Sequence, residues 1–317
     1  MSTIIALPSS ATAPLAQRTT RASASALGGC VRLLRVRQWL KNGFVFAPLV
    51  FAGKLMNGTS AEHAVGSFLS FSLVASAVYV LNDWSDRNND RQHPDKCNRP
   101  IADGTVSGTI AAVMGLCLIV AGVAVAWFTT NASVAALEVI YLAINAYYSF
   151  SLKHVVILDV FAIAIGFVIR ILVGAAAVGV SASHWLLLCT LLLTLFLGFS
   201  KRKSELKALG HSSNLYRTVL TSYSPTLITQ LNVILCAATL VCYALYTVAP
   251  ETVKNFGTDR LIYTVPFVIY GLFRYLFLME TTSEGANPSS LVLRDRSLGI
   301  SVALWLSACL FIIYGRS

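Results

Sequence analysis

The segment that decides the fold runs from Tyr79 to Pro100 and reads YVLNDWSDRNNDRQHPDKCNRP, at the end of a long apolar run. On a helix, five of its side chains fall three or four residues apart and therefore share one face. These are Tyr79, Asn82, Asp83, Asp86 and Asp90. Carboxylates this close repel one another unless a cation lies between them. Their oxygen atoms suit Mg²⁺, which commonly binds one or two carboxylates together with substrate phosphates. The segment therefore predicts a metal and phosphate site at a helix end.

The composition predicts a membrane protein. Hydrophobic residues make up 56% of the 317 residues and charged residues only 12%, whereas soluble domains carry about 25% charged residues. Apolar runs that can cross a hydrocarbon core of about 30 Å recur along the chain. We predict an all-α fold, a polytopic bundle of about nine transmembrane helices, with residues 31–317 as one domain. The expected spans are 42–56, 64–82, 108–128, 132–150, 155–179, 184–200, 226–248, 261–279 and 298–314.

The distribution of basic residues predicts the orientation of the chain. Eighteen Lys and Arg residues lie in the N-terminal segment and in the loops after the second, fourth, sixth and eighth spans, and three lie in the opposite loops. Basic loops favour the cytoplasmic side. We therefore expect a multi-pass protein of the inner or plasma membrane, with its N-terminus and active site in the cytoplasm. The net charge of +10 then reflects topology, and we expect no nucleic-acid partner.

The N-terminal residues and the cysteines carry weaker signals. Residues 1–30 are rich in Ser, Ala and Thr and contain no acid, which predicts a disordered tail. A transit peptide is the alternative, because Arg18 and Arg21 lie in this acid-free stretch. The seven cysteines show no metal-ligand spacing, and we expect no disulfide framework.

The residues that follow the acidic stripe are suited to phosphate. Lys96 and Arg99 lie between Pro94 and Pro100, and prolines favour a rigid, extended loop. A fixed loop that presents Lys and Arg near a bound metal provides what phosphate recognition requires. Two alternatives remain open. In the first, the basic loop only sets the membrane topology. In the second, the acidic stripe is a solvated helix end whose carboxylates pair with the arginines of the same helix.

Other polar residues are expected at the same membrane face. Asp159 opens the fifth span, where it would hold a second metal or accept a hydrogen bond from a substrate hydroxyl. Its alternative role is a helix-start charge that favours the helix dipole. Lys153 precedes this span, and Lys201 and Arg202 follow the sixth. No motif for a nucleophilic hydrolase, a zinc protease, a P-loop or a dinucleotide fold is present.

Several motifs together resemble the UbiA superfamily of membrane prenyltransferases, and within it the branch of decaprenyl-phosphate phosphoribosyltransferases. They are Leu34-Arg35-x-Arg37-Gln38-Trp39-x-Lys41-Asn42, Phe46-Ala-Pro48-Leu, Asn82 to Asp90, His93-Pro94-x-Lys96-x-x-Arg99-Pro100, Tyr148-Ser149, Leu152-Lys153-His154, Ile157-Leu158-Asp159, Gly166-Phe-x-x-Arg170, Lys201-Arg202-x-x-Glu205, and Asn287-Pro288 leading to Asp295-Arg296. Val36 stands where that branch usually has proline. Aromatic prenyltransferases of the superfamily carry a second full DxxxD motif, whereas Asp159 stands alone. This departure favours the phosphoribosyl branch.

The resemblance implies transfer of 5-phosphoribose from phosphoribosyl diphosphate to a polyprenyl phosphate, with release of diphosphate and dependence on Mg²⁺. The expected Mg²⁺ ligands are Asn82, Asp83, Asp86 and Asp90. The expected catalytic residues are Asp83, Asp86 and Asp159, since carboxylates can stabilise positive charge that develops on the anomeric carbon. The expected substrate-binding residues are Gln38, Lys41, Asn42, Tyr79, Lys96, Arg99, Lys153, Lys201 and Arg202.

Two other functions are compatible with parts of the sequence. A prenyltransferase that moves a prenyl group from a prenyl diphosphate to an aromatic or other acceptor would use the same acidic motif and metal. A transporter would place Glu138 and Arg170, both inside predicted spans, along a path through the membrane. Transporters, however, are typically built from repeats with broken helices at the midplane, while the polar clusters here gather at one face. Glu138 and Arg170 are equally expected to be interior structural partners.

Overall fold

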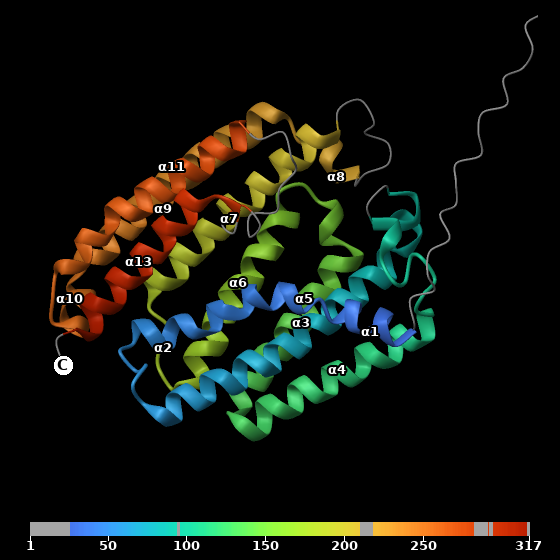
Figure 1. The fold of residues 1–317 in the computed structure, drawn as a ribbon, viewed down its shortest axis with the longest axis horizontal. Helices are drawn as coiled ribbons and strands as arrows, with labels where there is room; N and C mark the ends of the chain where they lie inside the picture. Colours follow the sequence, from blue (N-terminus) through green and yellow to red (C-terminus); the bar gives the residue numbers. More distant parts are fainter. Residues whose placement is uncertain (1–25, 94–95, 210–217, 282–290, 292–293, 316–317) are drawn as a thin grey trace, which may run out of the picture.

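The computed structural model describes residues 26–93, 96–209, 218–281, 291 and 294–315, and every regular element in these ranges is helical. Eight of the helices are long and apolar enough to cross a membrane. They are α3 (Gly58–Gln92), α4 (Gly108–Thr129), α5 (Ala132–Phe150), α6 (Leu158–Ala177), α7 (His184–Leu209), α9 (Pro225–Val248), α11 (Val265–Thr281, extended by the 3₁₀ helix η5, Arg260–Thr264) and α13 (Arg296–Tyr314). The predicted all-α membrane bundle is confirmed (Figure 1).

The first predicted span, residues 42–56, has a different structure. The chain forms α1 (Ala26–Leu34), the 3₁₀ helix η1 (Val36–Phe46) and α2 (Ala47–Phe51), none of which is a long α-helix. At the rises of 3₁₀ and α-helices, η1 and α2 together extend about 30 Å, so this segment covers the length of a span in a tighter helix that begins six residues earlier than predicted. Figure 1 shows it crossing the bundle in blue. Residues 26–30 of the predicted tail belong to α1, and the rest of that tail lies outside the described residues.

Capping residues explain where several long helices begin. The side chain of the residue before each of these helices accepts a hydrogen bond from the backbone N–H three residues later. This N–H lies in the first turn, where no carbonyl of the helix is available to accept it. These residues are Asn57 for α3, Ser107 for α4, Asn131 for α5, Ser224 for α9 and Asp295 for α13. In a membrane such caps matter because few alternative partners exist for the first N–H groups.

The centre of the bundle is built around α3 and α6, the two most buried of the eight long helices. Their apolar residues pack with η1 and α5 into one cluster that contains Val45, Phe71, Tyr141 and Val173. The close approach of η1 to α6 depends on Gly174, because a Cβ atom there would lie 2.0 Å from the carbonyl oxygen of Val45. Large apolar side chains on the outside of the bundle face the surroundings, as expected for helices in lipid.

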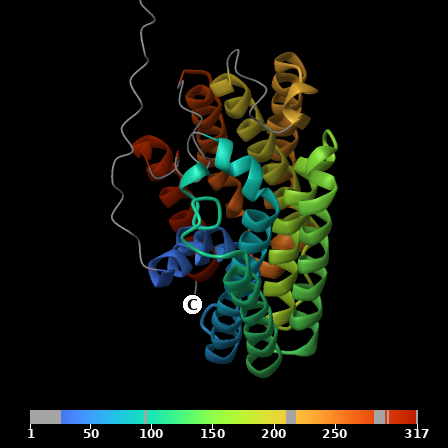
Figure 2. The same ribbon diagram turned by 90° about the vertical axis from the view of Figure 1, so that its right-hand side faces the viewer.

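The alternating helix directions gather the polar clusters at one end of the bundle. The ends of α3, α5, α7 and α11 lie there, together with the short helices η2 (Lys96–Asn98), η3 (Leu152–His154) and α8 (Thr218–Thr221). Figure 2 shows the end of α3 and the loop after it at the top of the bundle. The opposite end carries the end of α2, the α6–α7 connection and α10 (Pro250–Phe256).

Candidate active site

Two carboxylates of the acidic stripe are held by arginines from other segments. Asp83 and Asp90 are 2% and 3% exposed. Arg35, which lies between α1 and η1, donates from Nη2 to both oxygens of Asp83 at 2.5 and 2.7 Å. Arg99 donates from Nη1 to Asp83 at 2.9 Å and to Asp90 at 2.7 Å, so it bridges two turns of α3. Charge-assisted bonds of this kind compensate the cost of burying the carboxylates.

The other two residues of the stripe turn toward α5 and η3. Lys153 donates from Nζ to Asp86 at 2.6 Å and to the hydroxyl of Ser85 at 3.0 Å. Asn82 accepts a hydrogen bond from the Ser149 hydroxyl near the end of α5. The stripe is therefore divided between two sets of partners. Within the part of the chain that the structure describes, no three acidic, His or Cys side chains gather around a point where a metal ion could bind.

Asp159 occupies a separate, fully buried position at the start of α6. It accepts hydrogen bonds from Nε of Arg202 at 2.8 Å and from the hydroxyl of Tyr223 at 2.7 Å. The hydroxyl of Tyr223 in turn accepts one from the N–H of Ile157 at 2.6 Å. Burial and the hydrogen bond to Asp159 raise the pKa of Tyr223, which keeps it a donor. Ile157 has φ 72, a conformation that is rare for a β-branched residue and typical of functional sites.

Lys41 lies on η1 and has no acidic partner. It is partly buried, and within the described residues no acidic side chain pairs with it. The positive charges of Lys201, Arg170 and Arg35 act on it. A desolvated ammonium among like charges is a favourable place for an anion. Because Arg35 also holds Asp83, this anion position adjoins the acidic stripe.

Asn42 and Arg170 form a junction between helices. Asn42 is 1% exposed; it donates to the Ser72 hydroxyl at 3.0 Å and accepts from Nε of Arg170 at 2.9 Å. Arg170 also donates to the Gly166 carbonyl and lies over three aromatic rings. Glu138, fully buried, accepts from Ser70 at 2.6 Å, and no contact joins it to Arg170. Asn42 is therefore placed in a helix junction rather than on an open surface.

The remaining expected substrate-binding residues lie around this centre. The guanidinium of Arg35 lies over the ring of Tyr79, 5.2 Å from its centroid. Lys201 is 44% exposed and 3.9 Å from Glu205. The N–H of Lys96 donates to Nδ1 of His93 at 3.4 Å. Gln38 is partly buried and donates through its backbone to Arg35 at 2.7 Å.

Sequence reasoning about the site did not select Arg35, Ser149 or Tyr223. Arg35 is separated from Asp83 by 48 positions, and Tyr223 from Asp159 by 64, so no local spacing connects them. Arg35 and Ser149 belong to motifs that resemble the family, which was the available signal for them. Tyr223 carried no signal by which a sequence pattern would distinguish it from other polar residues near helix ends.

Comparison with known proteins defines the class of this membrane transferase. Residues 44–313 match the UbiA prenyltransferase family, and the chain belongs to that family. It is 32% identical to the decaprenyl-phosphate phosphoribosyltransferase of Mycolicibacterium smegmatis, over 94% of this chain and 96% of the relative. It is 30% identical to the decaprenyl-phosphate phosphoribosyltransferase of Corynebacterium glutamicum, over 90% of this chain and 87% of the relative.

Solved structures agree on the fold. A UbiA homolog from Archaeoglobus fulgidus bound to DMAPP and Mg²⁺ matches with a TM-score of 0.69, at 20% identity, over 90% of this chain and 99% of that one. The same homolog bound to GPP and Mg²⁺ matches equally well. At this level of identity the likeness establishes the arrangement of the helices.

Proposed function

We propose that this protein transfers 5-phosphoribose from phosphoribosyl diphosphate to a polyprenyl phosphate, of which decaprenyl phosphate is the expected form, and releases diphosphate. The relatives named above support this assignment over nearly the whole chain. The observation that carries it is the Lys41 position, an uncompensated cation beside the acidic stripe. A phosphoribosyl donor carries two separate anionic groups, a diphosphate and a 5-phosphate. The stripe with its bases and the Lys41 position would take one each.

Asn82, Asp83, Asp86 and Asp90 would hold Mg²⁺. Their oxygen donors fit this ion, although in the structure the carboxylates are engaged by Arg35, Arg99 and Lys153. When bound, Mg²⁺ supplies neutralisation of the charge on diphosphate oxygens. Arg99 and Lys153 would then exchange their carboxylates for phosphate oxygens, which are equally good acceptors for these cations.

Asp159 would act on the reacting ribose through the residues that it orients. Departure of diphosphate builds positive charge at the anomeric carbon, and fixed negative groups nearby stabilise it. Because Asp159 is fully buried and committed to Arg202 and Tyr223, we assign it a positioning role. It orients Arg202, which also bonds to Glu205 at 2.5 Å. The acceptor phosphate is already an anion, so the attack requires no general base.

The site would face the cytoplasm. It lies at the end of the bundle where Lys153, Lys201 and Arg202 gather, and basic residues favour that side. A water-soluble sugar-phosphate donor would then reach the site from the cytoplasm, while the lipid acceptor reaches it from the membrane. This arrangement gives a physical reason for a phosphoribosyltransferase to be embedded in a bilayer.

In the test, purified full-length protein in nanodiscs is incubated with Mg²⁺, decaprenyl phosphate and radiolabelled phosphoribosyl diphosphate. We expect label in the lipid fraction and release of one diphosphate per label incorporated. The second candidate function, a prenyltransferase, is favoured by the structural neighbours bound to prenyl diphosphates. Consumption of a prenyl diphosphate, with no label entering decaprenyl phosphate, would select it and exclude the proposal.

A further inference from the structure

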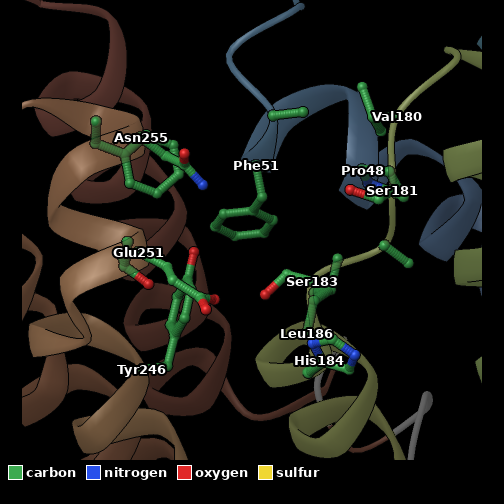
Figure 3. Close-up of a pocket in the computed structure, with 14 residues that line it drawn as sticks. Pro48, Phe51, Val180, Ser181, Ser183, His184, Leu186, Tyr246, Glu251 and Asn255 are labelled. Carbon is green, nitrogen blue, oxygen red and sulfur yellow. The ribbon is translucent and has the colours of Figure 1, made fainter.

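A pocket lies at the end of the bundle opposite the candidate active site. Its volume is about 290 Å³, and it is lined by α2, the α6–α7 connection, the end of α9 and α10. In Figure 3 the ring of Phe51 points into the space between α10, which carries Glu251 and Asn255, and the connection that carries Ser183. Pro48, which belongs to one of the family-resembling motifs, is among the lining residues, whereas the acidic stripe, Lys41 and Asp159 are not among them.

Aromatic rings form one wall of the pocket. Phe51 and Tyr246 meet edge to face, with centroids 6.5 Å apart and planes at 82°. Behind them, Trp305 lies 6.3 Å from Phe51 and donates from its indole nitrogen to the Tyr243 hydroxyl at 2.7 Å. The rings are therefore held in place before any ligand binds. Two perpendicular rings at a cavity wall present π faces that attract a cation.

The charge of the lining agrees with that preference. Glu251 is the one carboxylate among the lining residues, and no Lys or Arg is among them. Within the described residues Glu251 makes no ion pair. His184 is the one basic residue among the lining residues. Lys54 donates to the carbonyl of Val178 at 3.1 Å, and Lys254 lies on α10 without lining the pocket.

We propose that this pocket binds an organic ammonium group, free in solution or carried by a phospholipid headgroup such as phosphatidylethanolamine. The carboxylate of Glu251 compensates the positive charge, and the rings of Phe51 and Tyr246 contact its carbon substituents. A volume at the lower limit of small-molecule sites, about 300–1,000 Å³, fits a headgroup and excludes a long polyprenyl chain. The inference is independent of the proposed transfer reaction.

The test measures choline and ethanolamine binding by calorimetry to the full chain in phosphatidylglycerol nanodiscs. We expect saturable binding that Glu251→Gln and Phe51→Leu each weaken at least about tenfold. Asp259→Asn is the matched control, because it removes a carboxylate at the same end of the bundle, outside the pocket. It should change the affinity by less than about twofold. Transfer activity should be unchanged in Glu251→Gln, which separates this site from the active site.

A second arm identifies the source of the ammonium group. If nanodiscs of phosphatidylethanolamine abolish choline binding in the wild type and not in Phe51→Leu, the lipid headgroup occupies the pocket. If choline still binds there, the ligand is a soluble amine. Absence of saturable binding for both soluble probes and for the lipid overturns the proposal, as does equal weakening by Glu251→Gln and Asp259→Asn.

Discussion

Asp83 is the residue on which the most charged contacts of the site converge. Two guanidinium groups from segments on either side of α3 along the chain hold it, at 2.5 to 2.9 Å. A buried carboxylate between two arginines determines where each arginine points. Loss of its charge would leave Arg35 without its carboxylate and Arg99 with Asp90 alone, and breaking one member of a buried ion pair costs about 3–5 kcal/mol.

We therefore expect Asp83→Asn to lower the rate of transfer at least about 100-fold, since both the metal position and the arginines depend on this carboxylate. The measurement is incorporation of labelled phosphoribose into decaprenyl phosphate. Glu62→Gln is the control, an exposed acid near the start of the same helix. Wild-type turnover by Asp83→Asn in correctly inserted protein would rule out a role for Asp83 in the site.

Lys41 predicts that binding of the donor depends on a positive charge on η1. Within the described residues no acidic side chain pairs with Lys41, so a phosphate group of phosphoribosyl diphosphate would compensate its charge.

Two variants isolate this residue in calorimetric titrations with phosphoribosyl diphosphate. Lys41→Arg should retain most of the affinity, because arginine also carries a positive charge. Lys41→Gln should bind the donor weakly. Equal affinities of Lys41→Gln and the wild type would show that another group binds this anion.

At the scale of elements, the contact between η1 and α6 positions Lys41 and Asn42. Gly174 permits it, since a Cβ atom would lie 2.0 Å from the carbonyl oxygen of Val45. This oxygen belongs to the backbone of η1, so it cannot move aside as the end of a flexible side chain could. Asn42 then reaches both Ser72 on α3 and Arg170 on α6, which links the three elements.

Gly174→Ala should therefore displace η1 and destabilise the protein by about 1–3 kcal/mol or more. The apparent Tm in nanodiscs measures this, and the KM for the donor should rise as Lys41 moves. Gly271→Ala on α11 is the control, because its added Cβ would meet only the Ser301 hydroxyl, at an ordinary 3.7 Å. Equal Tm values for the two variants would contradict the proposed role of the close contact.

At the scale of the whole molecule, the site is assembled from η1, α3, the loop after α3, η3, α6 and α7. In the ligand-free structure its carboxylates and bases neutralise one another. Binding of Mg²⁺ alone would displace Arg99 and Lys153 and leave them without acceptors. Binding of diphosphate alone would place its negative charge beside the carboxylates, which would repel it. Each ligand therefore removes the main obstacle to the other.

This predicts that Mg²⁺ and diphosphate bind cooperatively. The affinity for Mg²⁺, corrected for the Mg²⁺–diphosphate complex in solution, should rise at least about tenfold when diphosphate is present, and the reciprocal increase must be equal. Calorimetric titrations of each ligand, with and without the other, measure both. Lys153→Met should strengthen binding of Mg²⁺ alone, because Asp86 loses its partner at 2.6 Å. Equal Mg²⁺ affinities with and without diphosphate would contradict the exchange of partners.

The sequence by itself determined the class of fold and the helix end that carries the acidic stripe. Eight of nine predicted spans correspond to the observed long helices, because the apolar length that a bilayer requires is a local property of the chain. The acidic stripe on one helix end was equally predictable, because its members recur every three or four residues on one α-helix, at Tyr79, Asn82, Asp83, Asp86 and Asp90. The placement of basic residues on alternate loops, which also follows directly from the sequence, gave the orientation proposed above.

Only the tertiary structure decided how charges are paired and how the first span is built. Arg35 meets Asp83 across 48 positions, and Asp159 meets Arg202 across 43. Periodicity cannot predict such partners, because several bases lie within reach of each acid until helix packing selects one. The segment η1 is a 3₁₀ helix that packs closely on Gly174 and is joined to Arg170 through Asn42. These contacts arise between segments far apart in the chain, and they exist only once the helices pack.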